Sequence, residues 1–256
     1  MKPHEIKQLV GNTPVMSLAQ ATRMTEFIHE HNIRDILELG FFRGVSTCYM
    51  AAALEESGGD SLVAIDLERA RPLVPNLQDL LAKCGYTDRV TYYYEPTSYT
   101  WRLMKFLEED STPRFDLCYI DGAHSWFVDG FAFFLVDRLL RVGGWLIFDD
   151  LDWTYDTSPA LRGTDQVKAM PEDERQTPQV RKVYDLLVKT HPNYGDFRVS
   201  HGWGYARKVS ESSAGPVETR REIQYLSFGD VISRVGRSSA GQYLLRIKQA
   251  MTGNRF

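Results

Sequence analysis

The feature that most constrains the fold of this chain is a regular alternation of short apolar runs with longer amphipathic segments. Strands that alternate with helices pack into a mostly parallel sheet covered on both faces, so the alternation predicts a doubly wound α/β fold. Five runs have the length and composition of buried strands: Ile33–Leu39, Leu62–Asp66, Val90–Tyr94, Phe115–Asp121 and Trp145–Asp149.

Helices are predicted between and around these strands, at Leu18–His31, Val45–Glu56, Pro72–Cys84, Tyr99–Glu109, Ser125–Leu140 and Gln179–Thr190. Gly143-Gly144 is expected to end the helix before it, because glycine is common just past a helix C-terminus. The polar segment Leu151–Thr177 is predicted to be a long loop over the sheet edge. Phe197–Ser200 and Gly204–Lys208 are predicted to form a closing hairpin.

Three parts of the chain are expected. Residues 1–32 form an N-terminal helical segment, residues 33–208 the main domain, and residues 209–256 a linker with a tail. Ser210–Pro216 has the composition of a linker, and the net basic tail Arg220–Phe256 is predicted to be a helical extension.

Composition excludes several classes of function. The formal net charge of −4 over 256 residues gives no general attraction to nucleic acid or to an anionic membrane. No stretch is apolar for long enough to cross a bilayer, and no apolar run behind Met1 resembles a secretory signal. The isolated Cys48, Cys84 and Cys118 are predicted to be buried free thiols, which favours the cytoplasm.

A glycine turn follows the first predicted strand. Gly40 and Gly44 let the backbone approach a ligand closely, and Ser46 and Thr47 begin a helix whose unpaired N–H groups can bind an anion. Asp66 ends the second strand, where a carboxylate can bind both hydroxyls of a ribose. Each feature also has a structural explanation: an ordinary strand–helix turn for the glycines, and a helix cap or solvated acid for Asp66.

The pattern Glu38-x-Gly40-x-x-x-Gly44-x-Ser46-Thr47, followed by Asp66, resembles the first two motifs of the class I S-adenosylmethionine methyltransferases. The resemblance runs over about residues 33–208 and implies a Rossmann-like, seven-stranded sheet. It implies that Gly40, Phe41 and Gly44 flank the methionine part of the cofactor, with Ser46 and Thr47 near its carboxylate and Glu38 supporting its ammonium end. Asp66 would hold the ribose, and Ser98 would lie near the adenine.

A second cluster of acids follows the fourth and fifth predicted strands. Asp121 ends one strand, and Asp149 with Asp150 ends the other. Parallel strands that stop together bring these carboxylates to one edge, where they would repel one another without a cation. Oxygen ligands suit Mg²⁺, with Ca²⁺ or Mn²⁺ as alternatives. The structural alternative is that the acids cap helices or are solvated.

This cluster resembles that of the metal-dependent O-methyltransferases that act on small molecules such as catechols and macrolide sugars. The resemblance implies Asp121, Asp149 and Asp150 as metal ligands, with Asp121 also beside the cofactor. Asp121-x-x-His124 matches the sugar-methylating members, in which the His serves as base. The catechol enzymes place a Lys at the position of His124, and relatives without metal have His-Asp where this chain has Asp149-Asp150.

The sequence therefore predicts transfer of a methyl group from S-adenosylmethionine to a hydroxyl of a small molecule, aided by Mg²⁺ and by His124 as base. Trp126, Trp153 and Tyr155 could wall the acceptor or simply pack. Two alternatives stay open: a metal-independent N- or O-methyltransferase, and a cofactor-binding relative without activity. The sequence does not specify the acceptor, and it leaves open whether the chain forms a homo-oligomer.

Overall fold

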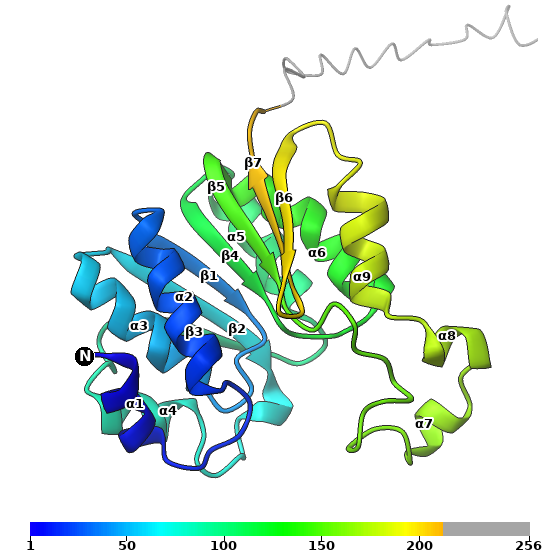
Figure 1. Cartoon of the computed structure of the whole chain (residues 1–256), viewed down its shortest axis with the longest axis horizontal. Coiled ribbons are helices and arrows are strands. Elements are labelled where there is room, and N and C mark those ends of the chain that lie inside the picture. The colour runs from blue at the N-terminus through cyan, green and yellow to red at the C-terminus, as the bar shows by residue number, and fades with distance from the viewer. Residues whose placement is uncertain (212–256) are drawn as a thin grey trace, which may run out of the picture. The chain divides into compact units, whose positions relative to one another are not determined.

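The computed structural model describes residues 1–211 and contains a seven-stranded sheet in the order β3-β2-β1-β4-β5-β7-β6 (Figure 1). The strands span Asp35–Leu39 (β1), Ser61–Leu67 (β2), Val90–Glu95 (β3), Phe115–Ile120 (β4), Leu140–Phe148 (β5), Tyr194–Ser200 (β6) and Trp203–Lys208 (β7). The first five pair in parallel, whereas β7 is antiparallel to both of its neighbours. The predicted mostly parallel sheet and its closing hairpin are confirmed.

Helices cover both faces of this sheet. Their bounds are Pro3–Val10 (α1), Leu18–Glu30 (α2), Val45–Ser57 (α3), Leu77–Cys84 (α4), Tyr99–Glu109 (α5), Trp126–Leu139 (α6), Asp165–Lys168 (α7), Glu172–Gln176 (α8) and Gln179–Val183 (α9). One core cluster joins the sheet to α1, α2, α3 and α4, and the other joins it to α5, α6 and α9. The fold is therefore doubly wound, as the alternation of the sequence predicts.

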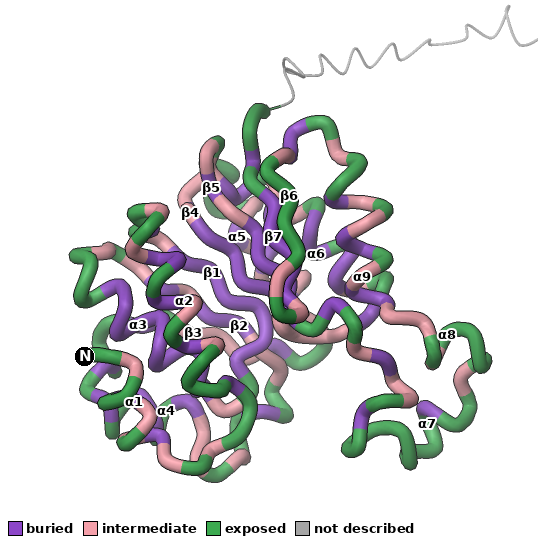
Figure 2. Tube along the Cα trace, in the orientation of Figure 1, coloured by how far each residue is buried: buried purple, intermediate pink, exposed green. Residues whose placement is uncertain are grey.

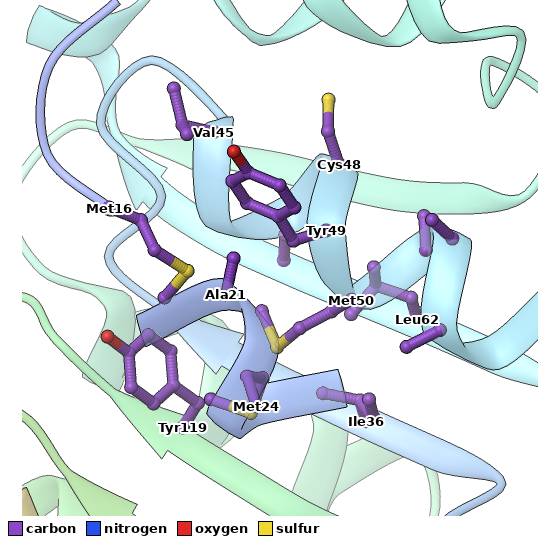
Figure 3. Packing of buried hydrophobic residues seen from close by; sticks show 14 of the residues in the cluster. Met16, Ala21, Met24, Ile36, Val45, Cys48, Tyr49, Met50, Leu62 and Tyr119 are labelled. Carbon is purple, nitrogen blue, oxygen red and sulfur yellow. The ribbon is translucent and has the colours of Figure 1, made fainter. Parts of the chain in front are cut away.

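Side chains alternate along each strand, which explains why both faces need helices. On β4, Leu117 and Tyr119 lie in the first cluster, whereas Cys118 and Ile120 lie in the second. All four are buried, and Figure 2 shows the central strands buried along most of their length. Figure 3 shows how methionines of the N-terminal segment and of α3 fill the first cluster beside Tyr119.

The expectation for Gly143-Gly144 is wrong, because these glycines lie inside β5. The backbone of Leu140 is already extended, so α6 passes directly into the strand. A Cβ on Gly144 would lie 2.9 Å from the Arg141 carbonyl oxygen and 3.0 Å from that of Asp116. Gly144 therefore allows the strand to pass close to β4 at a register irregularity near Phe115.

Other boundaries differ more modestly. The helix predicted from Pro72 begins only at Leu77, where Asn76 caps its first turn. The segment Leu151–Thr177 is mostly loop but contains the short helices α7 and α8. The helix predicted over Gln179–Thr190 is α9, continued by a π-helical turn over Tyr184–Val188.

The N-terminal segment contains one helix that the sequence analysis missed, α1, in which Ile6 and Val10 are buried against the first cluster. The helical extension predicted over Arg220–Phe256 lies outside the described residues. The three-part division of the chain stays a prediction. Among residues 1–211, no helix is both long enough and apolar enough to cross a membrane.

Candidate active site

The predicted site residues lie at or just beyond the carboxyl ends of the five parallel strands, β1 to β5. This edge is where open α/β sheets bind ligands, in the crevice left by the reversal of strand order. The reversal occurs between β1 and β4, so the glycine turn and the acid cluster lie next to each other.

Gly40 allows the turn after β1 to approach the turn after β4 closely. Its φ is +90°, and a Cβ there would lie 2.2 Å from the carbonyl oxygen of Asp121. Gly44 also has a positive φ and precedes α3, where a Cβ would meet Leu77 at 2.3 Å. Both positions therefore need glycine, and Gly40 joins the predicted cofactor turn to the start of the acid cluster.

Glu38 lies fully buried beneath the glycine turn. Its carboxylate accepts hydrogen bonds from the hydroxyls of Ser46 and Thr47, the latter at 2.6 Å. Burial raises the pKa of Glu38 to about 7, against these two stabilising hydrogen bonds. Both hydroxyls thus donate to Glu38, and their place near the cofactor carboxylate stays a prediction.

Asp66, at the end of β2, binds the glycine turn through the backbone. It accepts hydrogen bonds from the N–H groups of Phe41 at 2.9 Å, of Phe42, and of Leu67 at 2.6 Å. Burial raises the pKa of Asp66, and the three amides oppose that rise. The carboxylate thus fixes the turn while its remaining lone pairs stay available to a ligand.

A cavity of about 390 Å³ opens beside Asp66. That volume is within the range of sites for small molecules and cofactors. Ser98 lines it, with its hydroxyl accepting from the N–H of Thr100 at the start of α5, and its contact with the adenine stays a prediction. Residues that the sequence analysis did not assign also line it, namely Leu67, Arg69, Tyr99, Gly122, Val128, Leu161, Thr164 and Val167. The last three come from the segment around α7, so part of the predicted long loop covers the cavity.

The acid cluster brings Asp121, His124 and Asp150 together, with one ligand atom of each lying within 4.8 Å of the others. His124 Nε2 lies 3.0 Å from Asp150 Oδ2 and 3.7 Å from Asp121 Oδ1. Its Nδ1 lies 3.1 Å from the carbonyl oxygen of Gly122. Both partners, a carbonyl oxygen and a carboxylate oxygen, are acceptors, so the two contacts together fit a ring that donates from Nδ1 and from Nε2.

Asp149, the third predicted ligand, lies beside this cluster and is held by two hydrogen bonds. Its Oδ1 accepts the N–H of Asp150 at 2.6 Å, and its Oδ2 accepts the hydroxyl of Tyr119. The same hydroxyl lies 3.4 Å from Oδ2 of Asp121. Asp121 and Asp150 group with His124, and Asp149 lies next to them with Tyr119 as its partner, so the role of these acids as ligands stays a prediction. Sequence reasoning missed Tyr119, because a tyrosine inside a buried strand is normally part of the core.

The electrostatics of this cluster favour a positive charge. Burial raises the pKa of Asp121 well above its usual range, although 27% of its side chain is exposed, and Asp149 raises it further. Burial alone would lower the pKa of His124, but the hydrogen bond to Asp150 and the charge of Asp121 raise it to about 9. Without another cation, the imidazolium is therefore the form that these carboxylates stabilise.

The donor set fits a divalent cation. Carboxylate oxygens suit Mg²⁺, and an additional imidazole nitrogen suits Mn²⁺ and later transition metals. The three acids repel one another, and a cation would remove that repulsion. Trp153 packs on His124 with ring centroids 4.7 Å apart, and Tyr155 packs on Trp153. Trp126 instead lines a separate groove with Gln179 and Leu186.

The sheet order, the antiparallel β7 and the ligand edge together define the class I methyltransferase fold. Residues 37–151 match the model of a family described as a methyltransferase domain. This match, which covers less than half of the chain, agrees with the predicted class, a methyltransferase that uses S-adenosylmethionine. No curated protein matches the sequence.

Solved structures of low sequence identity share the fold. The O-methyltransferase from Bacillus cereus in complex with SAH is 22% identical, with a TM-score of 0.55 over 80% of this chain and 88% of its own. The O-methyltransferase TomG from Streptomyces achromogenes, involved in tomaymycin synthesis and in complex with SAM, is 20% identical, with a TM-score of 0.56 over 82% and 90%. The SAH-bound methyltransferase PaMTH1 from Podospora anserina is 17% identical, with a TM-score of 0.55 over 80% and 86%.

Proposed function

We propose that this protein transfers the methyl group of S-adenosylmethionine to a hydroxyl oxygen of a small molecule with the help of a divalent cation. The observation that carries the proposal is the cluster of Asp121, His124 and Asp150 directly beside the glycine turn. The glycine turn, as the proposed site of the methyl donor, contacts the end of β4 through Gly40. A hydroxyl bound at the acid cluster would therefore lie within reach of the methyl group.

S-adenosylmethionine would supply an electrophilic methyl group, held by the glycine turn and by Asp66 at the ribose. The cavity beside Asp66 and Ser98 has the volume and the partly apolar walls to take the adenosine part. The acceptor oxygen must attack in line with the departing sulfur, so the rigid strand ends contribute by orientation. Segments around α7 would exclude water from the cavity.

Asp121, Asp149 and Asp150 are the proposed ligands of the cation, which would orient an acceptor hydroxyl and make it more acidic. His124 would take the proton at Nε2. Because Nε2 also lies among the carboxylates, His124 as a third ligand in place of Asp149 is the alternative. Loss of cation affinity in a His124 variant would favour the ligand role, and loss of turnover alone would favour the base.

A metal-independent N- or O-methyltransferase is the second candidate function, and a cofactor-binding protein without activity is the third. Nothing in the site favours a nitrogen acceptor over oxygen. The family resemblance suggests a sugar or polyketide-type hydroxyl from natural-product biosynthesis as acceptor. We also propose that the protein is cytoplasmic, because its three cysteines are buried and free, as is usual in a reducing compartment.

Self-association with a second copy of the chain is part of the proposal. Phe127, Phe131 and Phe134 lie on one side of α6 and are 72%, 56% and 46% exposed. The adjoining groove, of about 400 Å³, is lined by Lys182 and by the acids Asp173 and Glu174. Two copies related by a two-fold axis can place Lys182 of one against those acids of the other, with the aromatic side chains between them.

Calorimetric titration with S-adenosylmethionine tests the cofactor site. We expect Asp66→Ala to weaken binding by about 1–3 kcal/mol, because ribose hydroxyls and the amides of the turn lose their acceptor. Asp88→Ala, which removes an exposed acid away from the cavity, is the matched control and should bind like the wild type. Unchanged affinity in Asp66→Ala would remove this residue from the site.

A further inference from the structure

Tyr119 is a fully buried tyrosine that connects two of the acids. Its hydroxyl donates to Asp149 Oδ2 and lies 3.4 Å from Asp121 Oδ2. A phenol has one proton to donate, so Asp149 receives the hydrogen bond and Asp121 lies within the field of the same O–H dipole. This one hydroxyl therefore lies within reach of both carboxylates.

The strand register explains why the hydroxyl reaches both acids. Tyr119 is opposite Ile147 and Ile120 is opposite Phe148, so Asp121 and Asp149 follow directly on two paired strands. Alternation along β4 puts the side chains of Tyr119 and Asp121 on one face of the sheet. The ring is held by the core, in edge contact with Trp203 at 5.8 Å between centroids. The hydroxyl is thus fixed by packing that does not depend on a ligand.

We propose that Tyr119 is a positioning residue that holds the carboxylates of Asp149 and Asp121 in the arrangement a divalent cation needs. The inference rests on the proposed function, because it requires Asp149 and Asp121 to bind the cation or to support the side chains that bind it. Two neighbouring carboxylates repel each other and would turn apart without a donor between them. Partners that orient metal-binding side chains usually change metal affinity about 10- to 100-fold when they are removed.

The chain offers a matched control in Tyr49, on α3. It is equally buried in the same core cluster, and its hydroxyl has no hydrogen-bond partner among residues 1–211. Figure 3 shows the two tyrosines in this cluster. Tyr49→Phe therefore removes a buried hydroxyl at comparable cost to packing without touching the acids.

The experiment is a titration of the full chain with Mn²⁺, followed by electron paramagnetic resonance of the free ion. S-adenosylmethionine affinity is measured in parallel as a sign that the fold is intact. Tyr119→Phe should bind Mn²⁺ about 10- to 100-fold more weakly than the wild type, with cofactor affinity unchanged, and Tyr49→Phe should match the wild type in both. Tyr119→Met, which also lacks the hydroxyl but fills space flexibly, should repeat the loss.

Mn²⁺ affinity within about twofold of the wild type in both Tyr119 variants would overturn the inference and leave the proposed function intact. An equal loss in Tyr49→Phe would also overturn it, because the effect would then be one of general stability. A wild-type protein that binds no Mn²⁺ would overturn both the inference and the cation in the proposed function.

Discussion

His124 is the residue whose chemistry depends most on its neighbours. Beside a bound cation and shortly before α6, a neutral imidazole could act as base near physiological pH. The arrangement of carboxylates instead raises its pKa to about 9. A bound cation would oppose that rise, so the ionisation of the working enzyme should lie at or below this value.

We expect His124→Ala to lower kcat by a factor of about 10²–10⁴, the usual effect of removing a general base. The base must be neutral, so wild-type kcat should rise with pH up to a midpoint no higher than about 9, and the variant should lack that ionisation. Steady-state kinetics across pH 6–10, with cofactor and Mn²⁺ affinities measured for both proteins, checks this. Equal kcat and an identical pH profile would place the base elsewhere.

Residue roles could be predicted from the sequence only where a motif fixes them. The turn from Gly40 to Gly44 and the positions of Asp66 and Asp121 follow from strand ends that the apolar runs reveal. The partners of Ser46, Thr47 and Asp149 could not be predicted, because a hydroxyl or carboxylate at a strand end has several neighbours within reach. Tyr119 could be recognised only once the register of β4 and β5 was known.

The glycine turn shows how one element positions another. The backbone of Gly40 packs against the carbonyl group of Asp121, so the end of β1 and the end of β4 form one unit. A side chain at Gly40 would separate them and displace both the cofactor turn and the first acid of the cluster. The two proposed binding sites are therefore connected through this backbone contact.

Gly40→Ala tests that connection, with Gly85→Ala as control. Both glycines have a positive φ, +90° and +79°, but an alanine Cβ at Gly85 would meet nothing within 4 Å. Gly85→Ala should lower the free energy of unfolding by about 1–2 kcal/mol, the usual cost of this backbone conformation. Gly40→Ala should cost a further 1–3 kcal/mol or so, because its Cβ would overlap backbone atoms. Equal costs in chemical denaturation would show that the contact with Asp121 matters little.

Among the elements, the strands of the sheet were predicted better than the ends of the helices. Buried strands produce unbroken apolar runs, and their ends coincide with acids and glycines. The helix ends were harder, because Gly143-Gly144 resembles a C-terminal signal but serves a strand that passes close to its neighbour. The short helix α1 was missed because its apolar residues, Ile6 and Val10, make only one face of two turns.

At the scale of the whole molecule, the aromatic side of α6 predicts self-association. Phe131→Asp should convert a dimer to a monomer in analytical ultracentrifugation, because it buries a charge at the centre of the proposed contact. Val15→Asp is the control, since Val15 is 62% exposed and lies away from this face. A monomeric wild-type protein, or a Phe131→Asp variant that stays dimeric, would contradict the proposed contact.

The central claim joins the fold to a cation-assisted transfer of a methyl group to oxygen, and its most direct test is turnover under chelation. The full chain is incubated with S-adenosylmethionine labelled in its methyl group and a panel of diols, catechols and sugars. After dialysis against excess EDTA, we expect no label on any acceptor that the untreated enzyme methylates, an unchanged circular dichroism spectrum, and recovery of turnover when Mg²⁺ or Mn²⁺ is added. Undiminished transfer of label in excess EDTA would contradict the account and favour a metal-independent methyltransferase.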